Sequence, residues 1–294
     1  MRQTLAYLGP EGSFSAQAAN MYAKNITSSL LELQAYTTIP AIFEALARNK
    51  ASLAIVPSEN SIEGSVTATM DLLVKDPPLY IRGEMILPIQ HHLLGPATDL
   101  SQITQVLSHP QALAQCREYL EKHLPEASLV ATNSTAEAAR LVAQGGPIQG
   151  NQAAISTLEC SSIYQLSVLA TDIADYANNE TRFLLIGREP LVLPPDTDMD
   201  INSSGNPPYK TSLIIDLKKD QPGGLYQVLG LFARENINLT RIESRPSKTA
   251  LGKYLFFIDC EASTNHSGLK SVLSELELLT ASCRNLGSYL TLVN

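Results

Sequence analysis

The stretch Pro190-Leu191-Val192-Leu193-Pro194-Pro195-Asp196-Thr197-Asp198-Met199-Asp200-Ile201-Asn202-Ser203-Ser204-Gly205-Asn206-Pro207-Pro208 decides how the chain is divided. It holds two proline pairs, a Ser-Ser-Gly run and several acidic residues, and it has little apolar content after Leu193. Such a composition is typical of a linker between folded regions. We therefore expect a first region at residues 1–189, a linker at residues 190–208 and a second domain at residues 209–294.

After the linker, short runs of apolar residues alternate with stretches of helical spacing. The expected strands are Thr211–Leu217, Leu239–Arg245, Lys253–Cys260 and Ser288–Leu292, and the expected helices are Pro222–Arg234 and Leu269–Leu279. The resulting order is βαββαβ. This order predicts an α+β ferredoxin-like fold, in which an antiparallel sheet carries two helices on one face.

Before the linker, apolar runs of strand length alternate with helical patterns, which predicts an α/β region. The expected elements are Thr4–Leu8, Ala16–Ala23, Ile39–Arg48, Leu53–Val56, Val66–Val74, Val106–Leu107, Ala112–Leu120, Ser128–Ala131, Thr135–Ala143, Ala153–Ile155 and Phe183–Ile186. Several of the loops that follow the strands are polar. Because open α/β sheets bind ligands beyond the ends of their strands, we expect these loops to build the functional site.

Composition excludes several classes of function. The 44% of hydrophobic and 17% of charged residues suit compact cores, and the net charge of −8 gives no general attraction for nucleic acid or an anionic membrane. The first residues hold too short an apolar run for a signal peptide, and no stretch reaches the roughly 18 apolar residues of a membrane span, so we expect a cytoplasmic protein.

Neither a metal nor a cofactor is indicated. The four cysteines lie far apart without C-x-x-C spacing, so we expect reduced and mostly buried thiols. His91 and His92 lie in an extended segment, where neighbouring side chains point to opposite faces and do not share a metal ion. His109 precedes a helix, and packing in the loop is the favoured interpretation there.

Two loops in the first third of the chain carry candidate binding groups. The first, Gly9–Ser15, joins a strand to a helix and offers Ser13 and backbone N–H groups to an anion, although a tight turn with a serine cap explains it equally well. The second, Pro57–Ser65, is denser in polar side chains than one helix cap requires. Its Glu59 and Asn60 are candidates for binding hydroxyl or carboxylate groups, and a capped turn is the alternative interpretation.

Two later segments add candidates of unequal strength. In Asn133–Glu137, Ser134 and Glu137 form a capping box, and Ser134 and Thr135 also stand where a helix end binds a carboxylate. Thr181-Arg182-Phe183 places a hydroxyl, a guanidinium and an aromatic ring at the start of an apolar strand. These groups suit a small ringed carboxylic acid, but the tripeptide alone is weak evidence.

Taken together, these loops occur in the order seen in prephenate dehydratases, and the resemblance covers nearly the whole chain. It includes Leu239-Thr240-Arg241-Ile242-Glu243-Ser244-Arg245-Pro246 in the second domain, which is similar to that family's Glu-Ser-Arg-Pro motif. The resemblance implies a catalytic region folded like a type II periplasmic binding protein, with two lobes around a cleft, followed by an ACT domain.

The resemblance also implies conversion of prephenate to phenylpyruvate in L-phenylalanine biosynthesis, without a cofactor. Carbon dioxide and a ring hydroxyl leave in one elimination that aromatisation drives. Thr181 matches the residue regarded as catalytic, and it is suited to donate a hydrogen bond to the departing hydroxyl. The resemblance implies that the substrate-binding residues are Ser13, Asn60, Ser61, Ser134, Thr135, Arg182 and Phe183, and Glu59 is added to them as the candidate from its loop.

For the second domain the resemblance implies allosteric regulation by L-phenylalanine and self-association to a dimer or tetramer. The implied effector-binding residues are Gly223, Gly224, Leu225, Asn238, Leu239, Glu243, Ser244, Arg245 and Pro246. Gly224 stands where alanine is usual in the family, which changes little because both residues are small.

Two other functions stay open at this stage. One is arogenate dehydratase, which carries out the same elimination on the transaminated substrate, and the other is a non-catalytic sensor of amino acids. No residue of the sequence separates the two substrates.

Overall fold

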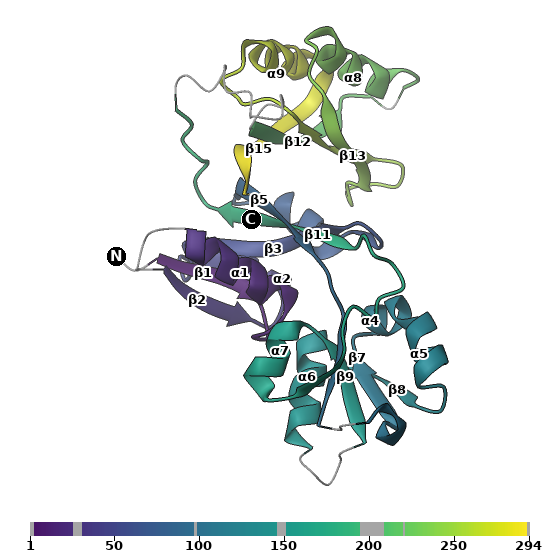
Figure 1. The fold of residues 1–294 in the computed structure, drawn as a ribbon. Helices are drawn as coiled ribbons and strands as arrows, with labels where there is room; N and C mark the ends of the chain where they lie inside the picture. Colours follow the sequence, from purple (N-terminus) through teal and green to yellow (C-terminus); the bar gives the residue numbers. More distant parts are fainter. Residues whose placement is uncertain are drawn as a thin grey trace. The chain divides into compact units, whose positions relative to one another are not determined.

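The structure is a computed structural model that describes residues 3–25, 31–96, 99–145, 151–194, 209–219 and 221–292. It divides into two compact units, one made of Met1–Thr69 and Ile86–Phe183 and the other of Met70–Met85 and Leu184–Asn294. Figure 1 colours the chain from the N-terminus to the C-terminus and labels many of its helices and strands. Residues 195–208 of the predicted linker lie outside the described residues. No helix within the described part of the chain is both long and apolar enough to cross a membrane.

The first unit begins with a parallel arrangement of three strands. β1 (Gln3–Leu8) pairs with both β2 (Leu31–Tyr36) and β3 (Leu53–Asn60), and β11 (Glu180–Gly187) lies beside β3. The helices α1 (Phe14–Asn25) and α2 (Ile39–Ala47) connect these strands. Leu53 to Val56 are all buried, as expected for a strand whose two faces are both covered.

β3 is longer than the sequence predicts, because it continues beyond Val56 to Asn60. The short strand β4 (Gly64–Ser65) folds back and pairs with Glu59 and Asn60 as a hairpin. The residues after Val56 are mostly polar and show no hydrophobic periodicity, so the sequence does not predict that β3 extends to Asn60. The extension is defined by pairing with β4. The chain then enters α3 (Thr67–Leu73) and β5 (Tyr80–Pro88).

A second sheet in the first unit has five strands in the order β10-β6-β9-β7-β8. The strands are β6 (His92–Gly95), β7 (Gln105–Ser108), β8 (Ser128–Ala131), β9 (Gln152–Ser156) and β10 (Ser167–Ala170). The helical segments are η1 (Leu100–Gln102), α4 (Pro110–Gln115), α5 (Arg117–His123), α6 (Thr135–Gln144) and α7 (Leu158–Tyr164).

Both faces of this second sheet are covered by helices. Leu93 and Val106 pack with residues of α4 and α5, whereas their neighbours Leu94 and Leu107 pack with the alanines of α6. The predicted single helix at Ala112–Leu120 is wrong. It is divided into α4 and α5 because Cys116, with φ −116° and ψ 19°, leaves the helical region.

The second unit holds the predicted βαββαβ order. The strands are β12 (Tyr209–Leu217), β13 (Leu239–Pro246), β14 (Tyr254–Cys260) and β15 (Thr280–Leu292), and the helices are α8 (Gly224–Arg234) and α9 (Ser267–Leu279). The four strands are antiparallel in the order β13-β14-β12-β15, and α8 and α9 lie on one face of them (Figure 1). This confirms the predicted ferredoxin-like fold.

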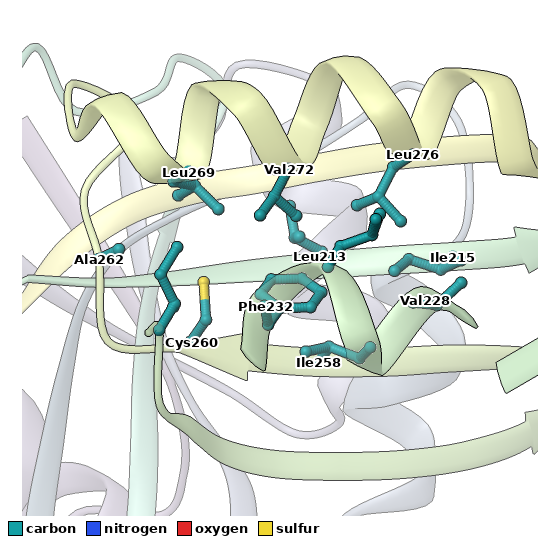
Figure 2. Close-up of a cluster of buried hydrophobic side chains, with 12 residues drawn as sticks. Leu213, Ile215, Val228, Phe232, Ile258, Cys260, Ala262, Leu269, Val272 and Leu276 are labelled. Atoms are coloured by element: carbon teal, nitrogen blue, oxygen red, sulfur yellow. The ribbon is translucent and has the colours of Figure 1, made fainter. Parts of the chain in front are cut away.

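The core of this sheet lies under the two helices. Figure 2 shows Phe232 of α8 and Val272 and Leu276 of α9 directed toward Leu213 and Ile258 of the strands. The last strand, β15, begins at Thr280 rather than at the predicted Ser288. The first half of β15 pairs with β12 as far as Leu217. This part of the strand has mixed polarity, so the sequence pattern does not predict it.

Candidate active site

A cavity of about 310 Å³ lies in the first unit. Its walls come from the segments that follow β1, β3, β7 and β8, together with His91 and the beginning of β11. In parallel sheets the carboxyl ends of the strands gather the following loops at one edge. The cavity therefore lies where the sequence analysis expects the functional site.

Three buried amide side chains form a chain of hydrogen bonds along the wall. Asn60 Nδ2 donates to Asn179 Oδ1 at 2.7 Å, and Asn179 Nδ2 donates to Gln115 Oε1 at 2.9 Å. His91 Nε2 lies 3.0 Å from the same Gln115 oxygen. All four side chains are at most 9% exposed. We call these four residues the amide relay.

The amide relay ends at Thr181. Asn60 Nδ2 donates to Thr181 Oγ1 at 3.0 Å, and Asn60 is held in turn by the backbone N–H groups of Ile62 and Glu63, both 3.0 Å from Asn60 Oδ1. Because an amide nitrogen carries no free lone pair, the threonine oxygen must be the acceptor. No residue of the described chain accepts a hydrogen bond from the Thr181 hydroxyl, so its hydrogen is available to a ligand.

Strand alternation separates the members of the Thr181-Arg182-Phe183 tripeptide. Thr181 and Phe183 line the cavity, whereas the Arg182 side chain does not. Ser58 Oγ donates to the backbone oxygen of Arg182 at 3.0 Å, which fixes the strand in place. The whole tripeptide lies inside β11, because this strand begins at Glu180 and not at Phe183 as the sequence analysis expects.

Two of the predicted hydroxyl groups line the cavity but serve as helix caps. Ser13 Oγ accepts from Ala16 N at 3.2 Å and donates to Leu8 O at 3.0 Å, and Ser134 Oγ accepts from Glu137 N at 3.0 Å. These caps begin α1 and α6, whose first-turn N–H groups have no partner within their helices. Thr135, the first residue of α6, also lines the cavity.

Glu59 and Ser61 are not part of the cavity lining. Ser61 Oγ instead accepts from Glu180 N at 2.9 Å and donates to Asn178 O at 3.1 Å. Ser61 therefore anchors the segment that carries Asn179 and Thr181. A supporting role is the interpretation that this geometry favours for Ser61.

The sequence analysis names Asn60 and His91, but it misses Gln115 and Asn179, the other two residues of the amide relay. An amide in a helix or in a loop has no distinguishing pattern. His91 and His92 were expected on opposite faces, and they do have separate partners, Gln115 and the backbone N–H of Asp172. His109 lines the cavity and also caps α4 through Nδ1.

The described lining residues include no lysine or arginine. A negatively charged ligand would therefore be held by neutral donors, of which the first turns of α1 and α6 are the most favourable because of the helix dipole. Glu63, an exposed residue, is also among the lining residues.

In the second unit, the predicted effector residues fall on α8, on the turn before β13 and on β13 itself. Gly223 has φ +83°, a conformation that favours glycine, and begins α8. Arg245 pairs with Asp71 at 2.8 Å and with Glu243 at 3.0 Å. Asn238 donates to Glu261 at 2.8 Å.

Comparisons with known families assign both parts of the chain. Residues 5–191 match the family described as prephenate dehydratase, and residues 211–277 match the ACT domain. A prephenate dehydratase of Methanocaldococcus jannaschii is 40% identical over 290 residues, which cover 98% of this chain and 98% of that protein.

Solved structures agree in fold. The prephenate dehydratase of Arthrobacter aurescens, in complex with L-Phe, superposes with a TM-score of 0.84 at 33% identity, over 98% of this chain and 90% of that one. A second structure, described as a novel type of quorum quenching acylase, has the same TM-score of 0.84 at 27% identity, over 99% of this chain and 98% of that one.

Proposed function

Because the chain belongs to the prephenate dehydratase family, we propose that it converts prephenate to phenylpyruvate, carbon dioxide and water. The bond to the ring carboxylate breaks and releases carbon dioxide, and its electron pair enters the ring. The C–O bond at the opposite ring carbon breaks, and the departing hydroxide takes up one proton to become water. Aromatisation drives this elimination, so the protein needs to hold a dianion and assist the departing oxygen. A cytoplasmic location, expected from the sequence, is part of the proposal.

One observation carries the proposed mechanism, namely the direction of the hydrogen bond between Asn60 and Thr181. Since Asn60 Nδ2 donates to Thr181 Oγ1, the hydroxyl hydrogen of Thr181 is directed to the ligand instead of the protein. A donor on Oγ1 also strengthens the acidity of that hydroxyl. Thr181 then donates to the leaving hydroxyl as negative charge develops on its oxygen.

The two carboxylates of prephenate need donors that the lining provides without a positive side chain. The N-terminal ends of α1 and α6 both line the cavity, the first at Ser13 to Ser15 and the second at Ser134 to Thr135. We assign the carboxylates to these two helix ends, where backbone N–H groups and the helix dipole favour negative charge.

Dehydration of arogenate is the second candidate, and one lining residue favours it. Arogenate carries an ammonium group where prephenate has a keto oxygen, and Glu63 is a lining residue whose carboxylate would suit an ammonium group. Comparing kcat/KM on the two substrates, in the native protein and in Glu63→Gln, separates the candidates. A lower preference for arogenate in Glu63→Gln would assign Glu63 to this discrimination.

The geometry gives less support to acyl transfer, the activity printed for the second solved structure. A threonine nucleophile needs a neighbouring base, and the side chain that contacts Thr181 is the amide nitrogen of Asn60, which accepts no proton.

Regulation by L-phenylalanine through the second unit is part of the proposal, as is self-association to a dimer or tetramer. The support is the match to the ACT domain and the L-Phe complex of the Arthrobacter aurescens relative. We assign Glu243 to Pro246, with the turn at Asn238 and Leu239 and the glycines before Leu225, to binding of the effector. Sedimentation and steady-state rates with and without phenylalanine test this assignment.

The central test is the rate of phenylpyruvate formation by the full-length chain and by Thr181→Ala and Thr181→Ser. We expect Thr181→Ala to lower kcat by about 100-fold or more, as removal of one transition-state donor does. Thr181→Ser keeps the donor and should retain much more activity. Full activity of Thr181→Ala would refute the role of Thr181, and absence of turnover on both substrates in the native chain would refute the proposed function.

A further inference from the structure

His91 is a buried imidazole that the mechanism above does not use. It stands between β5 and β6, is 3% exposed, and packs edge-on against the Phe14 ring with 5.8 Å between the ring centroids. Burial lowers the pKa of His91, and the nearby His92 lowers it further, whereas the hydrogen bond with Gln115 opposes the shift. The imidazole is therefore neutral at pH 7. A neutral imidazole carries one hydrogen, either on Nδ1 or on Nε2.

Backbone groups fix the orientation of the Asn60 amide, and this orientation determines the direction of each following hydrogen bond in the amide relay as far as His91. Asn60 Oδ1 accepts from two backbone N–H groups, and Asn60 Nδ2 donates to the backbone carbonyl of Glu180 at 3.1 Å. None of these three contacts survives a flip of the Asn60 amide. Because Asn60 Nδ2 is thus the donor, Asn179 must present its oxygen to Asn60 and its nitrogen to Gln115.

Gln115 consequently presents its oxygen to both Asn179 and His91. An oxygen can only accept, so His91 Nε2 must carry the hydrogen and donate to it. The opposite tautomer would set two acceptors against each other at 3.0 Å and would bury the N–H of Nδ1, for which the described chain offers no partner. A buried unpaired N–H costs more than a buried lone pair on nitrogen.

We propose that His91, as the Nε2–H tautomer, is a positioning residue that holds Gln115 and, through Asn179 and Asn60, the hydroxyl of Thr181. The expected effect of His91 on turnover rests on the proposed function, whereas the assignment of the tautomer does not. Gln115 Nε2 has no partner among the described residues, so only the contacts at its oxygen restrain this amide. Loss of the His91 donor therefore loosens the amide relay at the end opposite Thr181.

Nitrogen-15 NMR of the full-length protein tests the tautomer directly. The imidazole nitrogens of His91 should give the pattern of a neutral ring protonated on Nε2 at pH 7. The Nδ1–H pattern, or a doubly protonated ring, would overturn the inference whether or not the chain turns over prephenate.

Three substitutions test the effect on catalysis. His91→Gln places an amide nitrogen where Nε2 stood and should keep kcat close to that of the native protein. His91→Asn and His91→Phe lack a donor at that place and should lower kcat by about 10- to 100-fold with little change in KM, as misplacement of a catalytic group does. Equal kcat in all three variants, measured on folded protein, would overturn the positioning role.

His92→Asn is the matched control, since His92 Nδ1 accepts from Asp172 N outside the amide relay and an Asn oxygen can replace it. Thermal unfolding of all four variants separates loss of positioning from loss of structure. A structural role alone predicts that kcat per folded molecule stays constant while the melting temperature falls. The positioning role predicts a lower kcat in His91→Asn even under conditions where that variant is fully folded.

Discussion

The hydroxyl group of Thr157 donates a hydrogen bond of 2.7 Å to the backbone carbonyl oxygen of Gly12. Gly12 belongs to the loop after β1 on one sheet of the first unit, and Thr157 precedes α7 on the other. Both partners are buried. The contact therefore holds the segment of Ser13 and Phe14, which lines the cavity, against the second sheet.

Gly12→Ala should disturb this contact and lower the stability of the protein. Gly12 has φ +81°, and an added Cβ would stand 2.6 Å from Cys160 Sγ. The backbone conformation alone costs about 1–2 kcal/mol for an alanine, and the close approach adds to this. We expect a lower free energy of unfolding in urea and a lower kcat/KM.

Cys160→Ala provides the control for the steric part of that cost, because it removes the sulfur atom. The double variant should recover part of the loss in Gly12→Ala, whereas the part due to φ remains. An unchanged free energy of unfolding in Gly12→Ala would show that the close packing of Gly12 against Cys160 does not matter for stability.

Asn60→Asp tests the direction of the hydrogen bond to Thr181 with almost no change in shape. The aspartate oxygen would replace an amide nitrogen whose two hydrogens are shared among the oxygens of Asn179, Glu180 and Thr181. Thr181 would then donate its hydrogen to the protein instead of the substrate. We expect kcat to fall by about 100-fold, as measured by phenylpyruvate formation.

Loss of activity in Asn60→Asp through unfolding is checked by circular dichroism and by thermal unfolding. A kcat near that of the native protein in a folded Asn60→Asp variant would show that the hydrogen of Thr181 is not needed.

Arg182 and Phe183 should respond differently to substitution, because only Phe183 lines the cavity and it is 2% exposed. Phe183→Ala should cost about 3–5 kcal/mol of stability, as for other buried phenylalanines. Arg182→Gln should change kcat/KM by less than about 10-fold, since the side chain does not line the cavity. Activity and urea unfolding of the two variants decide this, and a larger kinetic effect of Arg182→Gln would place the guanidinium in substrate binding.

Thiol reactivity should depend on folding. Burial raises the pKa of Cys116 to about 12, with Asp175 adding to the shift, and raises the pKa of Cys260 to about 12 in the same way. Burial also raises the pKa of Cys160. Because the thiolate is the reactive form, alkylation at pH 8 should be slow in the native protein and fast in guanidinium. Mass spectrometry measures it, and rapid native labelling of Cys116 would contradict the packing.

Asp71 should contribute to stability at neutral pH but not in acid. Burial alone would raise the pKa of Asp71, but hydrogen bonds from Lys248 and Arg245 outweigh it and lower the pKa. A lowered folded pKa means that the contribution is present above the unfolded value of about 3.9 and is lost as pH falls through the folded value.

Asp71→Asn therefore removes part of the stability at pH 7 and flattens its decline below about pH 4. Urea unfolding at several pH values measures this. An equally steep acid decline in Asp71→Asn would show that the ion pairs with Arg245 and Lys248 contribute nothing.

Much of the fold could be predicted because its signals are local. Apolar runs of period two and of helical spacing give the α/β order before the linker and the βαββαβ order after it. Helix caps are local as well, so Ser134 was recognised from Glu137 three residues later. The misjudged elements, at Pro57–Asn60, at Cys116 and at the start of β15, depend on strand pairing or backbone geometry that distant segments impose.

Local patterns in the sequence predict which segments line the cavity, since loops after parallel strands gather at one edge of a sheet. The arrangement of the side chains in that cavity follows from tertiary contacts. The hydrogen bond between Asn60 and Thr181 joins residues 121 positions apart, and His91 reaches Thr181 through three amides from three separate segments. The direction of those bonds depends on which lone pairs and hydrogens face one another, and this is settled only when the chain has folded.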